Sequence, residues 1–428
     1  MRVLVLGGYG LIGLSVARRL LREGHRVTAL ARSARRGRAL LPEADWIEAD
    51  LSALTGPRLW RPRLADIDAV VNAAGVLQGG LRDDVVRVQR DSVIALVRAC
   101  EEAGVNVFVQ ISAPGAATDS STLFYRSKAA ADAAIRNSRL KWTIFRPGLV
   151  LSPQAYGGTS LLRMLAAFPL VQPVAAADVR IRTVSVDDVA DAVAAAVAGQ
   201  WAGEDFDLAE RDCHRLESLV LRLRQWMGFK RPLAVIRLPS AIVRALAACG
   251  DLAGWLGWRS ALRTTALRTL SDGVTGNGRA WTKASGRQLR SLDETLRSLP
   301  STVQERVYAR SSLIFPVLLL VLAGFWIVSG ILGLIRLDAA AAMLAGPERT
   351  ASAAVAAFAL ADIAVGAAML VRPFLRPACL AAIILSGAYL AGSLLFAPGL
   401  WADPAGPMIK IFPAAALALA VMALAEER

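Results

Sequence analysis

The sequence predicts an α/β domain with a doubly wound parallel sheet, followed by a helical extension and a four-helix transmembrane bundle. Three observations predict this fold. The first 200 residues alternate short apolar runs with amphipathic stretches, which is the rhythm of a parallel sheet covered by helices. Apolar residues make up 55% of the 428 residues, which is high for a soluble protein. Long stretches after Ser311 carry almost no charge, although the whole chain has a net charge of +14.

The predicted sheet begins at the N-terminus. Short apolar runs bounded by turn residues indicate buried parallel strands at residues 2–6, 26–30, 69–72, 105–111 and 142–145, and a further strand before Asp50. Residues 11–22 and 91–103 have the pattern of amphipathic helices between these strands. We expect this domain to occupy residues 1–210.

Residues 211–310 are expected to form a basic helical extension of the soluble domain close to the membrane. They contain 18 Lys and Arg against 7 Asp and Glu. Two interpretations stay open: a solvated basic face, or a surface that rests on anionic lipid, which attracts each basic side chain by about 1 kcal/mol. Nucleic acid is not an expected partner, because no recognisable binding fold accompanies the charge and a membrane segment follows.

Residues 311–428 are expected to cross a membrane four times, at about 313–335, 351–371, 377–396 and 408–425. The first span has 23 uncharged residues, enough for a hydrocarbon core of about 30 Å. Basic residues are in excess on the flanks beside the large domain and the C-terminus, where they are Arg306, Arg310, Arg372, Arg376 and Arg428, against Arg336 and Arg349 in the opposite loops. This excess predicts a multi-pass protein of the cell membrane whose N-terminal domain and C-terminus are cytoplasmic.

The cysteines and histidines exclude two other classes of protein. The four cysteines lie far apart without a CxxC pair, and neither His25 nor His214 lies near them as a zinc site would require. We therefore expect neither a disulfide framework nor a metal site. The apolar run at the N-terminus is too short for a signal peptide and continues into glycines, so the first domain should stay in the reducing compartment where it is made.

A glycine motif follows the first predicted strand and opens the first helix. Its sequence is Gly7-Gly8-Tyr9-Gly10-Leu11-Ile12-Gly13. Glycines at 7, 10 and 13 let the chain turn tightly and bring backbone N–H groups against a pyrophosphate at the positive end of the helix dipole. The motif predicts a dinucleotide-binding site.

The residues after the second strand predict which dinucleotide binds. An NAD site usually has an acid there for the ribose hydroxyls, whereas this chain has Arg32 followed by Ser33, Arg35 and Arg36. A guanidinium can pair with a 2′-phosphate, so NADP is favoured and NAD is less expected. The alternative is an ordinary basic surface loop. Asp50 either contacts the adenine or caps a turn.

Several further motifs resemble a known family. Asn72-Ala73-Ala74-Gly75, Ile111-Ser112-Ala113, Arg146-Pro147-Gly148 and Val186-Asp187-Asp188-Val189-Ala190 resemble the atypical short-chain dehydrogenase/reductases, in the branch that includes complex I accessory-subunit relatives. This resemblance covers about residues 1–300 and implies a Rossmann-type NAD(P)-binding domain. It also implies that the cofactor is contacted by Tyr9, Leu11, Ile12, Ala73, Ala74, Gly75, Lys128 and Pro147.

The last 115 residues resemble the DoxX-like membrane family. The motifs are Phe325-Trp326-Ile327-Val328-Ser329-Gly330, Ala361-Asp362-Ile363 and the run from Asp403-Pro404 to Pro413. Relatives of that family are associated with membrane redox and quinone chemistry. The resemblance therefore implies a reductase that works at a bilayer.

The catalytic pattern of the dehydrogenase family is altered in this chain. In the family, a Tyr four residues before a Lys transfers the proton that accompanies hydride transfer, and a Ser on the preceding loop polarises the carbonyl. Here Lys128 is preceded by Phe124 at that distance, Tyr125 is three residues before it, and Ser112 stands at the serine position. Tyr125 is displaced by about 100° around the helix. It either reaches the site through a shift in register or is an ordinary surface residue.

Two functions from different classes remain. The first is a membrane-anchored NADP-dependent oxidoreductase that acts on a lipophilic substrate, such as a quinone or a lipid carbonyl, with Ser112, Tyr125 and Lys128 as catalytic residues. The second is a non-catalytic NADPH-binding sensor or scaffold subunit of a membrane complex, which Phe124 favours. The sequence does not identify a protein partner.

Overall fold

The computed structural model describes residues 1–77, 79–80, 84–258, 262–271, 273–344 and 347–425. The chain folds into two compact units. The first comprises Met1–Gly254 and Arg259–Arg306, and the second comprises Trp255–Trp258 and Val307–Arg428.

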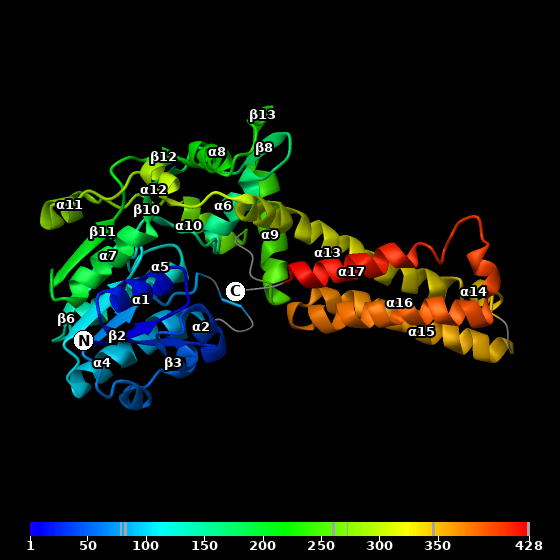
Figure 1. Cartoon of the computed structure of the whole chain (residues 1–428), viewed down its shortest axis with the longest axis horizontal. Coiled ribbons are helices and arrows are strands. Elements are labelled where there is room, and N and C mark those ends of the chain that lie inside the picture. The colour runs from blue at the N-terminus through cyan, green and yellow to red at the C-terminus, as the bar shows by residue number, and fades with distance from the viewer. Residues whose placement is uncertain (78, 81–83, 259–261, 272, 345–346, 426–428) are drawn as a thin grey trace. The chain divides into compact units, whose positions relative to one another are not determined.

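A seven-stranded parallel sheet forms the centre of the first unit (Figure 1). Its strand order is β11-β6-β5-β4-β1-β2-β3. The change of direction on either side of β1 makes the sheet doubly wound, so the predicted fold class is confirmed. The strands are β1 (Arg2–Leu6), β2 (Arg26–Ala31), β3 (Asp45–Glu48), β4 (Ala69–Asn72), β5 (Val107–Ile111), β6 (Lys141–Pro147) and β11 (Glu204–Leu208).

Helices cover both faces of this sheet because successive strand residues point to opposite sides. Val3 and Val5 of β1 pack in one cluster with α1 (Gly13–Arg22) and α7 (Val186–Val197). Leu4 and Leu6 pack in the other with α4 (Ser92–Ala103) and α5 (Leu123–Arg136). The strands therefore read as continuous apolar runs. Shorter helices are α2 (Ala34–Leu40), α3 (Pro57–Trp60) and α6 (Gly158–Ala166), with a 3₁₀ turn at Leu51–Ala53.

Some boundaries differ from the expected ones. β5 begins at Val107, because the Val105 amide donates to the Cys100 carbonyl and closes the end of α4. α4 begins at Ser92 after a π-helical turn at Arg87–Asp91. α1 begins at Gly13 because the preceding residues form the glycine loop.

The region after the sheet is not purely helical. It contains α8 (Leu216–Trp226), α9 (Ser240–Trp255), α10 (Thr264–Ser271), α11 (Arg279–Ser285) and α12 (Leu292–Ser298). Two short strands also pair back onto earlier segments. β12 (His214–Arg215) pairs with β9 (Arg180–Ile181), and β13 (Ala234–Arg237) pairs with β8 (Val171–Val174). A third small sheet joins β7 (Leu149–Leu151) and β10 (Thr183–Ser185).

The second unit is helical. Among the described residues, α13 (Val303–Ile335), α15 (Glu348–Leu370) and α16 (Leu375–Phe396) belong to helical stretches long and apolar enough to cross a membrane. α17 (Ile411–Leu424) is shorter than the expected fourth span, because residues 408–410 form a turn. Its 14 residues extend about 21 Å at 1.5 Å per residue. α14 (Leu337–Ala341) is a short connecting helix.

Candidate nucleotide-binding site

The glycine loop between β1 and α1 leaves no space for side chains at its three key positions. Gly7 has φ +70°, and a Cβ on it would lie 3.0 Å from the Ala74 Cα. A Cβ on Gly10 would lie 3.0 Å from the Gly7 carbonyl oxygen, and one on Gly13 only 2.2 Å from that oxygen. The loop is closed by the Gly10 amide, which donates to the Gly7 carbonyl at 2.8 Å. Such close approach requires glycine.

The first turn of α1 suits an anion. Residues 13–16 include no acidic side chain, and the capping residue Ile12 has no polar side-chain atom. The positive end of the helix dipole is therefore not neutralised by its own sequence. Leu11 and Ile12 are partly buried against the core cluster, which fixes the loop to the sheet. These residues fit the pyrophosphate of a dinucleotide.

The end of β2 places basic residues at the start of α2. Arg32 is exposed, and the Ser33 hydroxyl caps α2 by accepting from the Arg36 amide at 3.3 Å. The Glu48 carboxylate accepts from the Ala34 amide at 2.8 Å. Beside this segment, Tyr9 stacks on Trp46 with ring centroids 6.1 Å apart. An acid that sequence reasoning missed, Glu48, thus adjoins the position expected for the 2′-phosphate.

Asp50 caps a turn. Its Oδ1 accepts from the Ser52 amide at 2.9 Å, at the start of the 3₁₀ turn Leu51–Ala53. Of the two roles expected for Asp50, the structure shows the capping role.

The segment after β4 lies against the glycine loop. Ala73 and Ala74 are the residues that a Cβ on Gly7 would meet, and Gly75 follows them beside the Lys128 amine. Asn72 holds this segment, since its Nδ2 donates to Gln110 Oε1 at 2.9 Å and its Oδ1 accepts from the Ala74 amide at 3.2 Å.

Lys128 lies buried at the same edge of the sheet. Its Nζ donates to the Ile111 carbonyl at 2.7 Å and to the Ala74 carbonyl at 3.4 Å. Burial lowers the pKa of Lys128 to about 8, against the opposing effect of the nearby Asp132 carboxyl. The ammonium is thus anchored between the carboxyl ends of β4 and β5, beside Gly75.

Asp132 is a site residue that sequence reasoning missed. It lies one helical turn after Lys128, is 1% exposed, and accepts a 2.5 Å hydrogen bond from Ser112 Oγ. Burial raises the pKa of Asp132, although the Ser112 hydrogen bond and the Lys128 charge oppose this. Ser112 thus stands at the predicted serine position, and its hydroxyl donates to the Asp132 carboxylate.

Three buried polar atoms around this cluster have no hydrogen-bond partner within the part of the chain that the structure describes. They are Gln89 Oε1, Gln110 Nε2 and Asp132 Oδ1. Gln89 donates through its other amide atom to the Val76 carbonyl at 2.9 Å. Unpartnered buried polar atoms are rare and often mark functional sites.

Phe124 and Tyr125 lie in the first turn of α5, four and three residues before Lys128. Their rings meet edge to face at 5.3 Å. Tyr125 is 4% exposed, and its ring lies 3.6 Å from where a Cβ on Gly115 would stand. The interpretation of Tyr125 as a surface residue is therefore wrong.

Pro147 ends β6 and is buried, with its register partner Leu208 in β11. Arg146 before it donates to Asp205 at 2.7 Å and to Asp207 at 2.8 Å. These ion pairs fix the edge strand β11 to β6. Asp187 and Asp188 lie in the first turn of α7, where both pair with Arg290.

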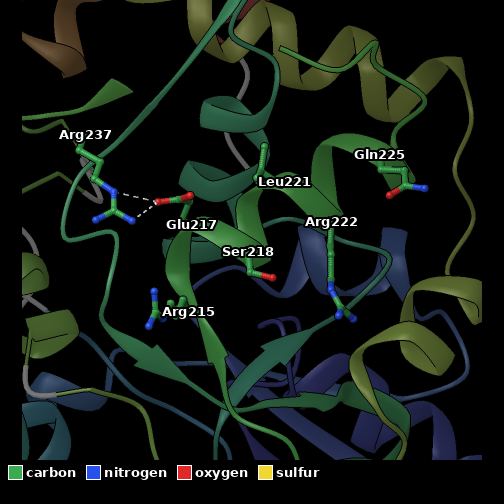
Figure 2. A pocket seen from close by; sticks show the side chains of 7 residues that line it. All are labelled: Arg215, Glu217, Ser218, Leu221, Arg222, Gln225 and Arg237. Atoms are coloured by element: carbon green, nitrogen blue, oxygen red, sulfur yellow. Dashed lines mark hydrogen bonds and ion pairs between the residues drawn. The ribbon is translucent and has the colours of Figure 1, made fainter. Parts of the chain in front are cut away.

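A separate surface pocket lies on α8 and the neighbouring strands (Figure 2). Its three arginines are ion-paired: Arg237 with Glu217 at 2.9 Å, Arg215 with Asp178 at 3.4 Å and Arg222 with Asp293 at 2.7 Å. None of its lining residues belongs to the glycine loop or to the ends of β4 and β5.

The parallel sheet, the glycine loop and the buried lysine define a Rossmann-type nucleotide-binding protein. The sequence matches the NAD(P)H-binding family over residues 7–200 and the DoxX-like family over residues 323–419. The chain therefore joins an NAD(P)-binding domain to a DoxX-like domain, as the motifs predicted. The DoxX-like match and the apolar helices indicate a membrane protein.

Curated relatives match part of the chain. The chain is 32% identical over 113 residues to the photosystem II assembly factor Ycf39 of Synechocystis, which is 26% of this chain and 33% of that protein. It is 27% identical over 164 residues to NADH dehydrogenase [ubiquinone] 1 alpha subcomplex subunit 9 of Arabidopsis thaliana, 37% of this chain and 39% of the relative. The chain thus spans well under half the length of these relatives.

Solved structures share the fold. The Bordetella bronchiseptica enzyme WbmH in complex with NAD⁺ superposes with a TM-score of 0.53 at 17% identity, over 72% of this chain and 98% of that one. UDP-glucose 4-epimerase of Thermotoga maritima gives 0.52 at 17% identity, over 73% and 100%. At this identity the likeness shows the fold.

Proposed function

We propose that this protein is a membrane-anchored, NADP-dependent oxidoreductase of the short-chain dehydrogenase/reductase type that acts on a lipophilic substrate such as a quinone or a lipid carbonyl. The observation that carries the proposal is the glycine loop beside a buried Lys128, in one chain with a DoxX-like domain. Bound NADPH would supply a hydride. The bilayer that holds the second unit would supply a lipophilic substrate.

Each residue has a role in this proposal. Gly7, Gly10 and Gly13 admit the pyrophosphate to the open end of α1, and Arg32 pairs with the 2′-phosphate. The Lys128 ammonium donates hydrogen bonds to the ribose hydroxyls. Ser112 orients the substrate, with its hydroxyl fixed by Asp132. Because the Phe124 side chain has no hydroxyl that could donate a proton, Tyr125 or water delivers the proton that accompanies the hydride.

The charges support a cytoplasmic first unit. Under the positive-inside rule, the basic flanks favour an N-terminal domain and a C-terminus on the same, cytoplasmic side. The excess of positive charge in residues 211–310 then faces a leaflet that contains anionic lipid.

The test is turnover by the full chain reconstituted in lipid vesicles. NADPH absorbance is followed after addition of a short-chain quinone or a long-chain aldehyde, with Gly13→Ala as the inactive control. Steady consumption by the wild type that the variant lacks supports the proposal. NADPH binding without consumption across both acceptor classes contradicts it.

A second candidate is a non-catalytic NADPH-binding sensor or scaffold subunit. Phe124 in place of the usual tyrosine favours it, and two relatives are named as an assembly factor and a complex subunit. NADPH binding with a flat absorbance trace in the same experiment would favour this candidate.

A further inference from the structure

Helix α9 has a broad apolar face that is exposed. Ile242 and Leu246 are 47% and 44% exposed, and Leu252 is 65% exposed. At 100° per residue, these three side chains fall within an arc of roughly 120°. The two charged residues of the helix, Arg244 and Asp251, lie on another side, and Asp251 pairs with Arg263 at 3.2 Å.

The opposite side of α9 is already packed. Ala247, Gly250 and Gly254 are buried. A Cβ on Gly250 would lie 3.2 Å from the Leu262 backbone, and one on Gly254 would lie 2.8 Å from the Arg263 guanidinium. This stripe of small residues fixes the rotation of the helix, so the exposed apolar arc is a defined face.

Two more exposed apolar side chains directly precede the paired strands β8 and β13. Leu170 is 70% exposed and Leu233 is 82% exposed. They are neighbours, because the Leu233 amide donates to the Leu170 carbonyl at 2.7 Å. We call Ile242, Leu246 and Leu252 of α9 the apolar surface.

Basic residues predominate in the sequence around the apolar surface, and the two nearest acids, Asp251 and Glu217, pair with Arg263 and Arg237. Residues 218–250 contain six Lys and Arg and no Asp or Glu. Apolar side chains among basic ones are the composition of segments that lie in the interface of an anionic membrane.

The chain that leaves α9 is fixed to the ends of apolar helices. Trp255–Trp258 belongs to the second unit. There the Trp258 indole donates to the Leu370 carbonyl at 2.7 Å, and the Arg372 amide donates to the Leu256 carbonyl at 2.9 Å. The Arg372 guanidinium lies 5.3 Å from the Trp258 ring centroid. Leu370 ends α15 and Arg372 begins the turn before α16, and Trp and Arg at such helix ends are typical of the lipid–water interface.

We propose that the apolar surface inserts into the headgroup–acyl boundary of the membrane leaflet, with anionic lipid around it. The last residue of α9, Trp255, belongs to the segment that is held at the ends of the apolar helices, so the chain ties the end of α9 to the interface. This inference does not depend on the oxidoreductase reaction. The insertion of Leu246 and Leu252, and not the attraction of basic side chains alone, would then hold α9 to the lipid.

The natural Cys249 offers a direct test. It is exposed on the apolar arc of α9, whereas Cys100 and Cys379 are buried. We would replace Cys213 by Ser, label Cys249 of the full chain with an environment-sensitive fluorophore, and reconstitute it in phosphatidylcholine and phosphatidylglycerol vesicles. Quenching by lipids with a nitroxide near the top of the acyl chain, and protection from aqueous iodide, are the expected results.

Two outcomes would overturn the proposal. Free quenching by iodide would mean that α9 faces water. Protection from iodide without quenching by the nitroxide lipids would mean that protein, such as a second copy of the chain, covers the face.

Matched variants sharpen the test. Leu246→Glu combined with Leu252→Glu should abolish quenching by nitroxide lipids at Cys249. Leu59→Glu, at a residue of α3 that is 47% exposed, should leave it unchanged. NADPH titration of each variant verifies that the first unit is folded, so a loss of quenching is not mistaken for unfolding. The wild-type result decides the proposal even where a variant fails to fold.

Discussion

Among the described residues, Asp132 in the first unit and Asp362 in the second are both buried and accept hydrogen bonds from hydroxyl groups, but they differ in their other partners. Asp132 in the first unit is 1% exposed and Asp362 in the second is 3% exposed. Asp132 accepts from Ser112 and lies one turn after Lys128. Asp362 accepts from the Tyr389 hydroxyl at 2.9 Å and the Ser329 hydroxyl at 3.2 Å, and no ion pair to it occurs among the described residues.

The difference indicates different roles. Asp132 on α5 lies close to the buried Lys128 ammonium, so its charge acts on that cation. Asp362 on α15 instead bonds to α13 and α16, and so links three helices. Close packing supports that link, since a Cβ on Gly330 of α13 would lie 2.3 Å from the Ala359 carbonyl of α15. Interhelical hydrogen bonds of this kind stabilise membrane bundles modestly.

The largest expected effect is a loss of NADPH affinity when the glycine loop of the first unit is changed. Gly13→Ala forces a Cβ to 2.2 Å from the Gly7 carbonyl, so the loop must open. We expect NADPH affinity to fall about 100-fold, or about 2.8 kcal/mol, in a fluorescence titration. Gly56→Ala is the control, because its Cβ meets nothing within 4 Å and its φ is −126°. Equal loss in both variants would contradict the proposed loop.

Arg32→Ala is expected to have the next largest effect. Loss of a charge-assisted contact to the 2′-phosphate should weaken NADPH about tenfold, or about 1.4 kcal/mol, and leave NADH affinity unchanged. Arg38→Ala, an exposed residue of α2, serves as the matched control. An equal loss of affinity for NADPH and NADH would show that Arg32 does not contact the 2′-phosphate.

In the second unit, Tyr389→Phe removes one hydrogen bond to Asp362. We expect the free energy of unfolding in detergent to fall by about 1 kcal/mol, because such bonds between membrane helices are weak. NADPH affinity and turnover should not change. A turnover defect in a stably folded Tyr389→Phe protein would instead give the Asp362 cluster a part in the reaction.

The smallest effect concerns pH. Since Lys128 has a pKa of about 8, NADPH affinity should fall as the pH rises through that value and the ammonium loses its proton. The Asp132 charge raises the Lys128 pKa, so Asp132→Asn should move the midpoint to lower pH. Lys128→Met should abolish the dependence.

The control for this pH shift is Asp205→Asn, which removes a carboxylate paired with Arg146 and Arg136. Its midpoint should stay at the wild-type value. The same midpoint in Asp132→Asn as in wild type would show that Asp132 does not act on Lys128.

The sequence predicted the features that depend on local pattern. The apolar runs at β1, β2 and β4 identified the strands, and the glycine spacing identified the loop, because both are imposed by neighbouring residues. Asp132 was missed because a carboxyl in an amphipathic helix looks ordinary until Ser112, twenty residues away, is packed against it. The strand partners β8 and β13 were missed because their pairing joins distant segments.

The assignment of Trp255–Trp258 to the second unit also could not be predicted from local sequence pattern. Trp258 reaches the Leu370 carbonyl across 112 residues of sequence, so nothing near Trp258 indicates that it belongs to the second unit. The fourth span was expected to begin at residue 408 because hydropathy does not distinguish a turn from a helix start. Glu48 was missed because its contact with Ala34 depends on the pairing of β2 with β3.

The most direct test of the central claim is a fluorescence titration of the detergent-purified full chain with NADPH and, separately, with NADH. We expect a saturable change with NADPH that is much weaker with NADH, that the Gly13→Ala variant lacks and that the Gly56→Ala variant keeps. Absence of saturable binding of either nucleotide to the folded wild-type protein would contradict the nucleotide site, and with it the proposed function.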